Sequence, residues 1–285
     1  MIRLFWYEIP NFGDMLSPYI VKSLSGDNVS FYNPLSFKRV FRNYVSAIKC
    51  LLRGRTSIAK RQILFTRKPV LIAVGSLLEH STTHCVCWGT GMAQKMKIPS
   101  GGKFVMTRGF LSKAVLEDAG YKVESETCGD PALLMPLLIR PDVKPIPNRI
   151  GVIPHISEID EVKEYLKNEN DKVIIDFRTK EYKPTIKKLL ECSFVYSSSL
   201  HGIILCHAYG IPCLWFQYHV FAGGDFKFND HFSAVGITPY KPLDIEDIKR
   251  NKRLDDKYEA VPRNTINMIQ KELIKNAPFT ITAKI

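Results

Sequence analysis

The chain has 285 residues, long enough for two domains, because single domains usually run about 100 to 200 residues. Hydrophobic residues make up 45% of it and charged residues 24%, a balance that excludes disordered and fibrous proteins. The net charge of +12 has a local origin, since residues 28–78 contain ten lysines and arginines and no acidic residue.

The first half of the chain alternates between strand and helix patterns. Residues 2–7 form an apolar strand pattern, and the Asn-Phe-Gly-Asp stretch at 11–14 supplies turn and N-cap residues before a helical spacing of apolar side chains. Three further strands and one helix are predicted at residues 70–74, 85–88, 104–106 and 110–119.

A proline-rich stretch from Asp142 to Asn148 is typical of a connector, so we predict domains at 1–145 and 146–285. The alternation then resumes. Strands are predicted at 150–153, 173–176, 194–196 and 212–216, and helices at 158–167, 182–192, 200–209 and 261–276. We expect the last helix to pack back on the N-terminal domain.

Alternating strands and helices predict parallel sheets covered on both faces, because parallel neighbours need a crossover helix. The predicted fold class is therefore α/β, with two doubly wound Rossmann-like domains facing a cleft. Ligands of such sheets bind beyond the carboxyl ends of the strands. Gly75, Gly89, Arg108, His155 and His201 each follow a predicted strand, so we expect them at one cleft.

The seven cysteines are odd in number and lack a Cys-x-x-Cys spacing, which favours buried thiols in a reducing compartment. A zinc site at His84, Cys85 and Cys87 is conceivable, but the alternation around them fits a strand better, and no metal site is predicted. With neither a cleavable signal pattern nor a membrane-spanning apolar run, the chain is expected in the cytosol.

His201 stands where the strand at 194–196 gives way to the helix at 200–209. One interpretation is a first-turn residue behind a serine N-cap, its ring bonded to a backbone carbonyl. The other is an acid/base group at the mouth of a crevice, since histidine titrates near neutrality and a helix N-terminus lowers its pKa.

Two other sites could bind ligand. Arg108 could grip a phosphate or carboxylate with its planar guanidinium, or be a surface arginine. Gly13 permits close approach of the backbone to a ligand, and Asn11 or Asp14 could bind hydroxyls, although helix capping by Asp14 is the simpler explanation. Dinucleotide and Walker phosphate loops are absent.

The basic segment is predicted as an insertion at about 28–68 that contains an amphipathic helix. Such a helix can lie on an anionic membrane, at about 1 kcal/mol per near-surface Lys or Arg, or be a solvated surface helix. A nucleic-acid partner is not predicted, because no recognition motif accompanies the charge.

Five motifs, in this order, resemble the polysaccharide pyruvyl transferase family. They are Asn-Phe-Gly-Asp-Met-Leu at 11–16, Thr-Arg-Gly-Phe-Leu-Ser at 107–112, Cys-Gly-Asp-Pro-Ala-Leu-Leu at 128–134, Gly-Val-Ile-Pro-His at 151–155 and Ser-Ser-Ser-Leu-His-Gly at 197–202. The resemblance implies a GT-B type arrangement. It also implies transfer of pyruvate from phosphoenolpyruvate to a sugar of a bacterial surface or capsular polysaccharide as a ketal, with no cofactor or metal.

Carried onto this sequence, the resemblance makes His201 the acid/base residue and Arg108 a donor-binding residue. Ser199 lies where many members of the family have arginine, and Lys103, Lys113 or Lys227 could replace that cation. The expected substrate-binding residues are Arg108, Asn11, Gly13, Asp14, Gly75, Gly89, His155, Ser199 and Leu200.

The expected acceptor is a lipid-linked glycan, reached by binding of residues 37–68 to the inner face of the plasma membrane. Two alternatives stay open: a GT-B glycosyltransferase that uses a nucleotide sugar, and a noncatalytic membrane-associated assembly factor.

Overall fold

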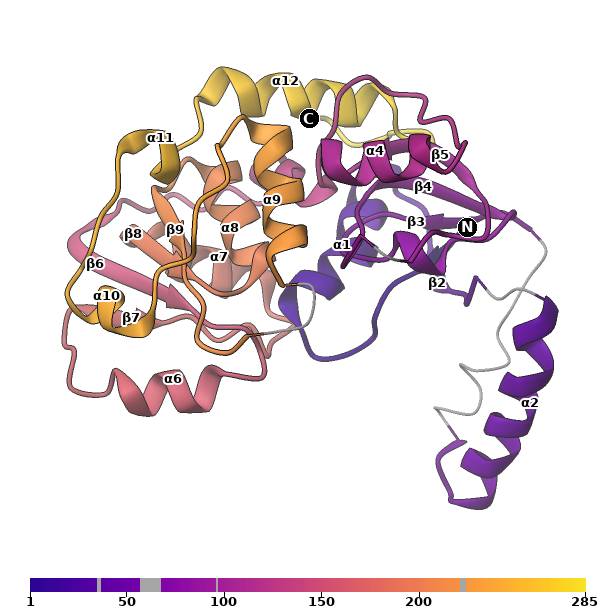
Figure 1. Cartoon of the computed structure of the whole chain (residues 1–285), viewed down its shortest axis with the longest axis horizontal. Helices are drawn as coiled ribbons and strands as arrows, with labels where there is room; N and C mark the ends of the chain where they lie inside the picture. Colours follow the sequence, from indigo (N-terminus) through magenta and orange to yellow (C-terminus); the bar gives the residue numbers. More distant parts are fainter. Residues whose placement is uncertain (35–36, 57–67, 96, 221–223) are drawn as a thin grey trace.

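The protein is built from two parallel β-sheets, one from each half of the chain (Figure 1). The computed structural model describes the chain apart from residues 35–36, 57–67, 96 and 221–223, and the side chains of residues 37–43 also lie outside the description. Parts of the predicted basic insertion therefore fall outside the described residues.

The first sheet has five parallel strands in the order β2-β1-β3-β4-β5. The strands are β1 (Ile2–Phe5), β2 (Val29–Phe31), β3 (Val70–Ile72), β4 (Cys85–Thr90) and β5 (Lys103–Thr107). Helices of this half are α1 (Phe12–Ser25), α2 (Phe37–Leu52), the 3-10 turn η1 (Leu78–His80) and α4 (Phe110–Asp118). The strand over Cys85 and Cys87 is confirmed, with both thiols buried.

The second sheet has four parallel strands in the order β7-β6-β8-β9. The strands are β6 (Ile146–Ile153), β7 (Lys172–Ile174), β8 (Cys192–Ser197) and β9 (Cys213–Trp215). The helices are α6 (Ile159–Tyr165), α7 (Tyr182–Leu190), α8 (Leu200–Tyr209), α9 (Gly224–Val235), α10 (Ile245–Lys249), α11 (Asp256–Glu259) and α12 (Arg263–Lys275). The prediction of parallel α/β sheets is confirmed.

The structure contains two elements in and just before the expected connector that the sequence did not predict. β6 begins at Ile146, inside the stretch treated as irregular, because its one proline, Pro147, lies where the ladder with β8 is interrupted between Ile146 and Ile150. Upstream, η2 (Pro131–Leu134) and α5 (Met135–Leu138) form a short helical segment. Asp130 caps it by accepting the Ala132 N–H at 2.9 Å.

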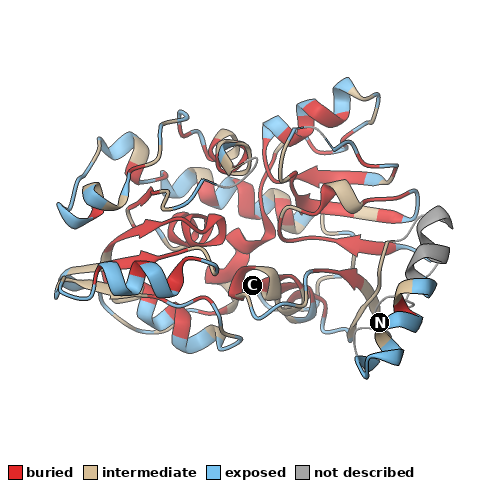
Figure 2. Cartoon of the chain, turned by 60° about the horizontal axis from the view of Figure 1, so that its bottom comes forward, coloured by how far each residue is buried: buried red, intermediate tan, exposed pale blue. Residues whose placement is uncertain are grey.

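Helix α12 and the residues after it pack on the N-terminal half. The indole Nε1 of Trp88 in β4 donates to the carbonyl of Leu273 at 3.0 Å, and the Gln270 amide donates to the carbonyl of Leu133 at 2.7 Å. Further on, the Thr282 N–H donates to the carbonyl of Leu24 at 2.9 Å. Figure 2 shows buried residues in both sheets and in the elements between them.

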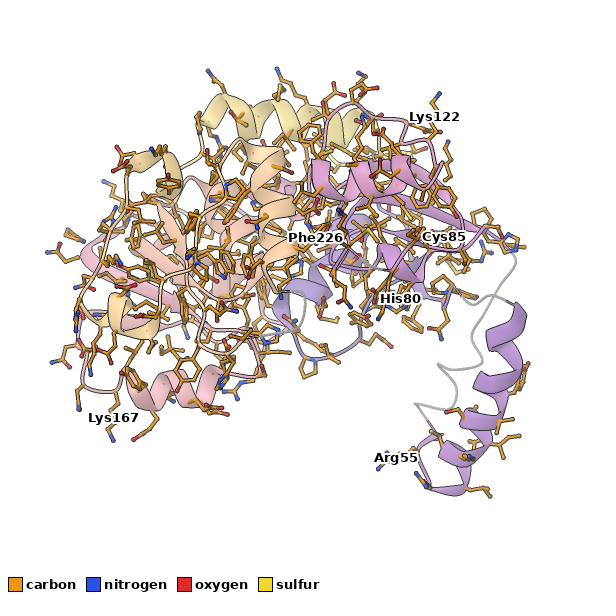
Figure 3. All side chains as sticks on the ribbon, in the orientation of Figure 1. Arg55, His80, Cys85, Lys122, Lys167 and Phe226 are labelled. Atoms are coloured by element: carbon orange, nitrogen blue, oxygen red, sulfur yellow. The ribbon has the colours of Figure 1, made fainter. Side chains whose placement is uncertain are left out.

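Helix α2 projects away from the rest of the molecule (Figure 1). Five of its described apolar side chains are exposed, and Leu52 reaches 83%; they are Tyr44, Val45, Ile48, Leu51 and Leu52. Arg55 lies at the far end of this projection (Figure 3). Among the described residues, no helix combines the length and apolar character needed to cross a bilayer.

Candidate active site

A cavity of about 290 Å³ lies between the two halves of the chain. The residues around it follow β1, β3 and β4 of the first sheet and β6, β8 and β9 of the second. The carboxyl ends of strands from both sheets thus face the same cavity. Parallel α/β sheets bind their ligands at this end of the strands. The lining residues are Tyr7, Ile9, Asn11, Asp14, Ser76, Glu79, Ala93, His155, Ile156, Ser199, Leu200, His201 and Lys227.

His201 lies in the first turn of α8 and is 8% exposed. Its ring rests against the backbone of Gly13 at the start of α1, where a Cβ atom would lie 2.0 Å from the His201 Nδ1. Any other residue at position 13 would therefore displace the imidazole. The close approach expected of Gly13 is an approach to a side chain of the opposite half.

The His201 ring lacks the hydrogen bond to a backbone carbonyl that a purely structural role at the start of α8 would predict. Its Nε2 is buried and has no hydrogen-bond partner among the described residues, and Ser199, the N-cap of α8, makes no side-chain capping bond. The neighbouring serines are occupied elsewhere: Ser197 Oγ donates to the Ile153 carbonyl, and Ser198 Oγ to the Glu158 carboxylate at 2.7 Å. An unpaired ring nitrogen beside a cavity is available to a ligand.

Burial lowers the pKa of His201 to about 3, and the nearby cations Arg108 and Lys227 act in the same direction. Burial disfavours the charged form of a base, and like charges disfavour it further. The imidazole is therefore neutral near neutral pH and can accept a proton.

The start of α1 places two polar side chains at the cavity. Asn11 is the N-cap, since its Oδ1 accepts the Gly13 N–H at 3.1 Å, so the prediction that Asp14 caps this helix was wrong. The Asn11 amide also donates to Asp14 Oδ2 at 2.9 Å. Burial raises the pKa of Asp14 to about 6, against the lowering effects of Asn11 and Lys227.

Of the three lysines considered as replacements for the missing arginine, Lys227 lines the cavity. Lys103 pairs with Glu124 at 3.4 Å and Lys113 with Glu126 at 2.6 Å, both away from the cavity. Burial, followed by the charge of Arg108, lowers the pKa of Lys227. Its ammonium is thus a poorly solvated cation, which gains from an anionic ligand.

Arg108 and Gly89 were expected at the cavity, and neither lines it. Arg108 is fully buried: its Nε donates to Asp230 Oδ2 at 2.9 Å, its Nη1 to Ser76 Oγ at 2.7 Å and its Nη2 to the Met92 carbonyl at 2.7 Å. Its Nη1 reaches the cavity wall at Ser76. Gly89 instead packs against Pro131, where a Cβ would lie 2.4 Å from the proline Cδ.

Gly75 lies close behind the cavity wall. Its φ of +103° belongs to the region that favours glycine, and a Cβ there would lie 3.7 Å from Asp14 Oδ1. His155, Ser199 and Leu200 line the cavity, with the His155 N–H donating to Ser198 Oγ at 2.8 Å.

Tyr7 and Glu79 were missed by sequence reasoning. Burial, then the charges of Glu79 and Asp14, raises the pKa of Tyr7 to about 12, and its hydroxyl lies 2.7 Å from His80 Nε2. The available signal was position alone, since Tyr7 follows the first strand and Glu79 lies in η1, which follows β3. Among the described residues, no group of three or more His, Cys, Asp or Glu side chains could hold a metal ion.

Comparison with known proteins places these features in a family. Residues 11–220 match the family model described as polysaccharide pyruvyl transferase. The uncharacterized protein L143 of Acanthamoeba polyphaga mimivirus is 35% identical over 191 residues, which are 64% of this chain and 66% of that protein, slightly under two thirds of its length. No solved structure matches the chain. With the family model covering most of the sequence, the chain belongs to the polysaccharide pyruvyl transferase family.

Proposed function

We propose that this protein is an enzyme that transfers pyruvate from phosphoenolpyruvate to two hydroxyls of a surface or capsular polysaccharide sugar, forming a ketal across a cleft of GT-B type. The observation that carries the proposal is the pairing, in one cavity, of a neutral imidazole with an unpaired nitrogen and a poorly solvated lysine. The family match supplies the class of group transferred.

Ketal formation requires balanced proton transfers. C3 of phosphoenolpyruvate gains a proton, C2 becomes electrophilic, the first sugar hydroxyl adds to C2, and the bond from C2 to the phosphate oxygen breaks. A second hydroxyl then adds to C2 and closes the ring. Two hydroxyl protons are released: one balances the proton taken by C3 and the other leaves with phosphate. A base that can take up and return protons accelerates such steps.

The residues divide these tasks between them. His201 Nε2 is assigned the proton exchange, because it is unpaired and neutral. Lys227 is assigned the binding of the donor's carboxylate or phosphate, and the backbone N–H groups at the start of α8 assist it. Arg108 is assigned a supporting role, in which its buried charge holds Ser76 and adds positive potential below the donor.

Donor binding gives the most direct test. Titration calorimetry should detect binding of phosphoenolpyruvate to the wild-type protein, and Lys227→Met should weaken it by about 1.5–3 kcal/mol, the scale of a charge-assisted hydrogen bond. Lys103→Met serves as the matched control, because Lys103 lies on β5 away from the cavity. Binding of UDP or GDP sugars in place of phosphoenolpyruvate would instead identify a nucleotide-sugar glycosyltransferase.

We further propose that α2 holds the enzyme on the inner face of the plasma membrane, next to a lipid-linked acceptor. The support is the projection of α2, its exposed apolar side chains, and the nearby cations Lys49, Arg53 and Arg55. Amphipathic basic helices bind anionic bilayers through both features.

Flotation with liposomes tests this location. The wild-type protein should float with anionic vesicles and much less with neutral ones, and replacing Lys49, Arg53 and Arg55 by glutamine should reduce recovery. Glutamine at Lys163 and Lys167, on and just after α6, should leave recovery unchanged. Equal recovery with both kinds of vesicle would count against an electrostatic membrane contact.

A further inference from the structure

The two walls of the cavity carry opposite charge. Tyr7, Asp14 and Glu79 come from the N-terminal half, whereas Lys227, the lysine of this cavity, comes from α9 of the C-terminal half, together with His201 from α8. A trianionic donor is attracted to the Lys227 wall and repelled by the two carboxyl groups opposite. The charges therefore orient the donor and leave the acidic wall to a different ligand.

The Glu79 carboxylate can accept a hydrogen bond from a ligand. Its Oε2 is buried and has no hydrogen-bond partner among the described residues, while its Oε1 lies 3.6 Å from His80 Nε2 and 3.8 Å from Lys97 Nζ. A buried carboxylate oxygen without a partner is rare in folded proteins. Because carboxylate oxygens only accept hydrogen bonds, a ligand that fits here must bring O–H or N–H groups.

The remainder of this wall suits a sugar ring. Tyr7 and Ile9 provide aromatic and apolar surface next to the two carboxyl groups. Carbohydrates present C–H faces to such surfaces and hydroxyl hydrogens to acceptors. An acidic sugar would place its own carboxylate beside Asp14 and Glu79, where like charges repel.

We propose that the wall formed by Tyr7, Asp14 and Glu79 is the acceptor subsite, and that it selects a sugar without acidic groups by accepting hydrogen bonds from its two reacting hydroxyls. The inference rests on the proposed pyruvyl transfer and adds the class of acceptor. The first hydroxyl attacks C2 of the donor and passes its proton to Asp14. The bound trianion offsets the charges of Arg108 and Lys227 and raises the pKa of His201, so the ring takes up a proton before it passes that proton to C3. The proton received by Asp14 balances the one given to C3, and the proton of the second hydroxyl leaves with the phosphate.

The groups around Asp14 allow it to take the proton of the first hydroxyl. Asn11 donates to its Oδ2 at 2.9 Å, Lys227 and Tyr7 are its charged and titratable neighbours, and Glu79, His155 and His201 share the same cavity. Burial raises the pKa of Asp14 to about 6, so the carboxylate is ionised near neutral pH and a stronger base than an ordinary aspartate.

Saturation-transfer NMR tests the subsite with the full-length protein. The probes are the methyl glycosides of neutral hexoses and of the corresponding uronic acids, each with and without phosphoenolpyruvate. We expect at least one neutral glycoside to bind, and the uronates to bind about tenfold more weakly or not at all. Glu79→Gln should weaken the neutral glycoside about tenfold and reduce the discrimination against uronates, with phosphoenolpyruvate affinity within about twofold of wild type.

Glu124→Gln is the matched control, because Glu124 is a partly exposed residue paired with Lys103 outside the cavity. Equal binding of uronates and neutral sugars to the wild type, absence of any glycoside binding, or full glycoside binding by Glu79→Gln would overturn the proposal. Failure of phosphoenolpyruvate to bind the wild type would instead overturn the proposed function.

The role of Asp14 has its own readout. Asp14→Asn should retain glycoside binding but yield at least about 100-fold less pyruvylated glycoside, detected by its added mass, with the turnover of wild type falling as the pH drops below about 6. Wild-type product formation by Asp14→Asn would remove this residue from the proton transfer.

Discussion

Replacing His201 by glutamine is expected to lower turnover about 100- to 10,000-fold, the usual contribution of a general acid/base group. Glutamine keeps a polar side chain of similar reach next to Gly13 but cannot exchange the proton. Phosphate release from phosphoenolpyruvate in the presence of acceptor measures the loss, and calorimetry should show donor affinity within about threefold of wild type.

The matched control is His84→Gln, because His84 is an exposed histidine before β4 and outside the cavity. Unchanged glycan product from His201→Gln would favour the noncatalytic assembly factor over the enzyme. Loss of donor binding together with turnover would show that the imidazole holds the donor as well as moving protons.

The lowered pKa of His201 makes the stability of the fold depend on pH. Its folded-state pKa of about 3 lies below the ordinary 6.5, so the unfolded chain binds more protons, and stability contributed by the neutral ring is lost as pH falls from 6.5 towards 3. A bound trianion offsets the charges of Arg108 and Lys227 and therefore raises the pKa of the ring. NMR titration of labelled histidine should detect this rise in the phosphoenolpyruvate complex.

Asp230→Asn is expected to destabilise the fold by about 3–5 kcal/mol, the cost of leaving one partner of a buried ion pair uncompensated. Asp230 on α9 and Arg108 after β5 are both fully buried, with Arg108 Nη2 and Asp230 Oδ2 2.8 Å apart. The Ser112 N–H and Oγ donate to the same carboxylate, each at 2.7 Å. Asparagine preserves the volume but removes the charge opposite the guanidinium.

Urea unfolding followed by circular dichroism measures the change in the free energy of unfolding. Asp118→Asn at the exposed end of α4 is the control and should stay within about 0.5 kcal/mol of wild type. A change for Asp230→Asn as small as that of the control would mean that solvent reaches the pair. Since the pair joins α9 to the β5–α4 turn, the loss should also reduce the docking of the two halves.

The position of the site was predictable, because it depends on strand ends. Asn11, Gly13, Asp14, His155 and His201 all follow strand patterns, and parallel sheets bring such residues to one edge. The short elements were harder to predict. β2 has three residues, and the segment from Pro131 to Leu138 was hidden by prolines that sit at helix starts.

Pairings between distant residues could not be predicted. Arg108 was expected to face a ligand because it follows a strand, but its partner Asp230 lies 122 positions away in the chain. Lys227 and Lys113 are equally plausible cations in the sequence. They are separated by the packing of α9 against the N-terminal half, where Phe226 packs against a buried apolar cluster that includes Phe5 and Ile72 (Figure 3).

The return of α12 to the N-terminal half has a consequence for fragments of this protein. Expressed alone, residues 1–145 would lack the Leu273 carbonyl that receives the Trp88 indole, and would leave the surface that meets Ile269 in water. Residues 146–285 would carry α12 with part of its buried face, including Ile269 and Leu273, exposed to water. We therefore expect that neither fragment folds stably when it is expressed alone. The two fragments should regain the native structure when they are mixed.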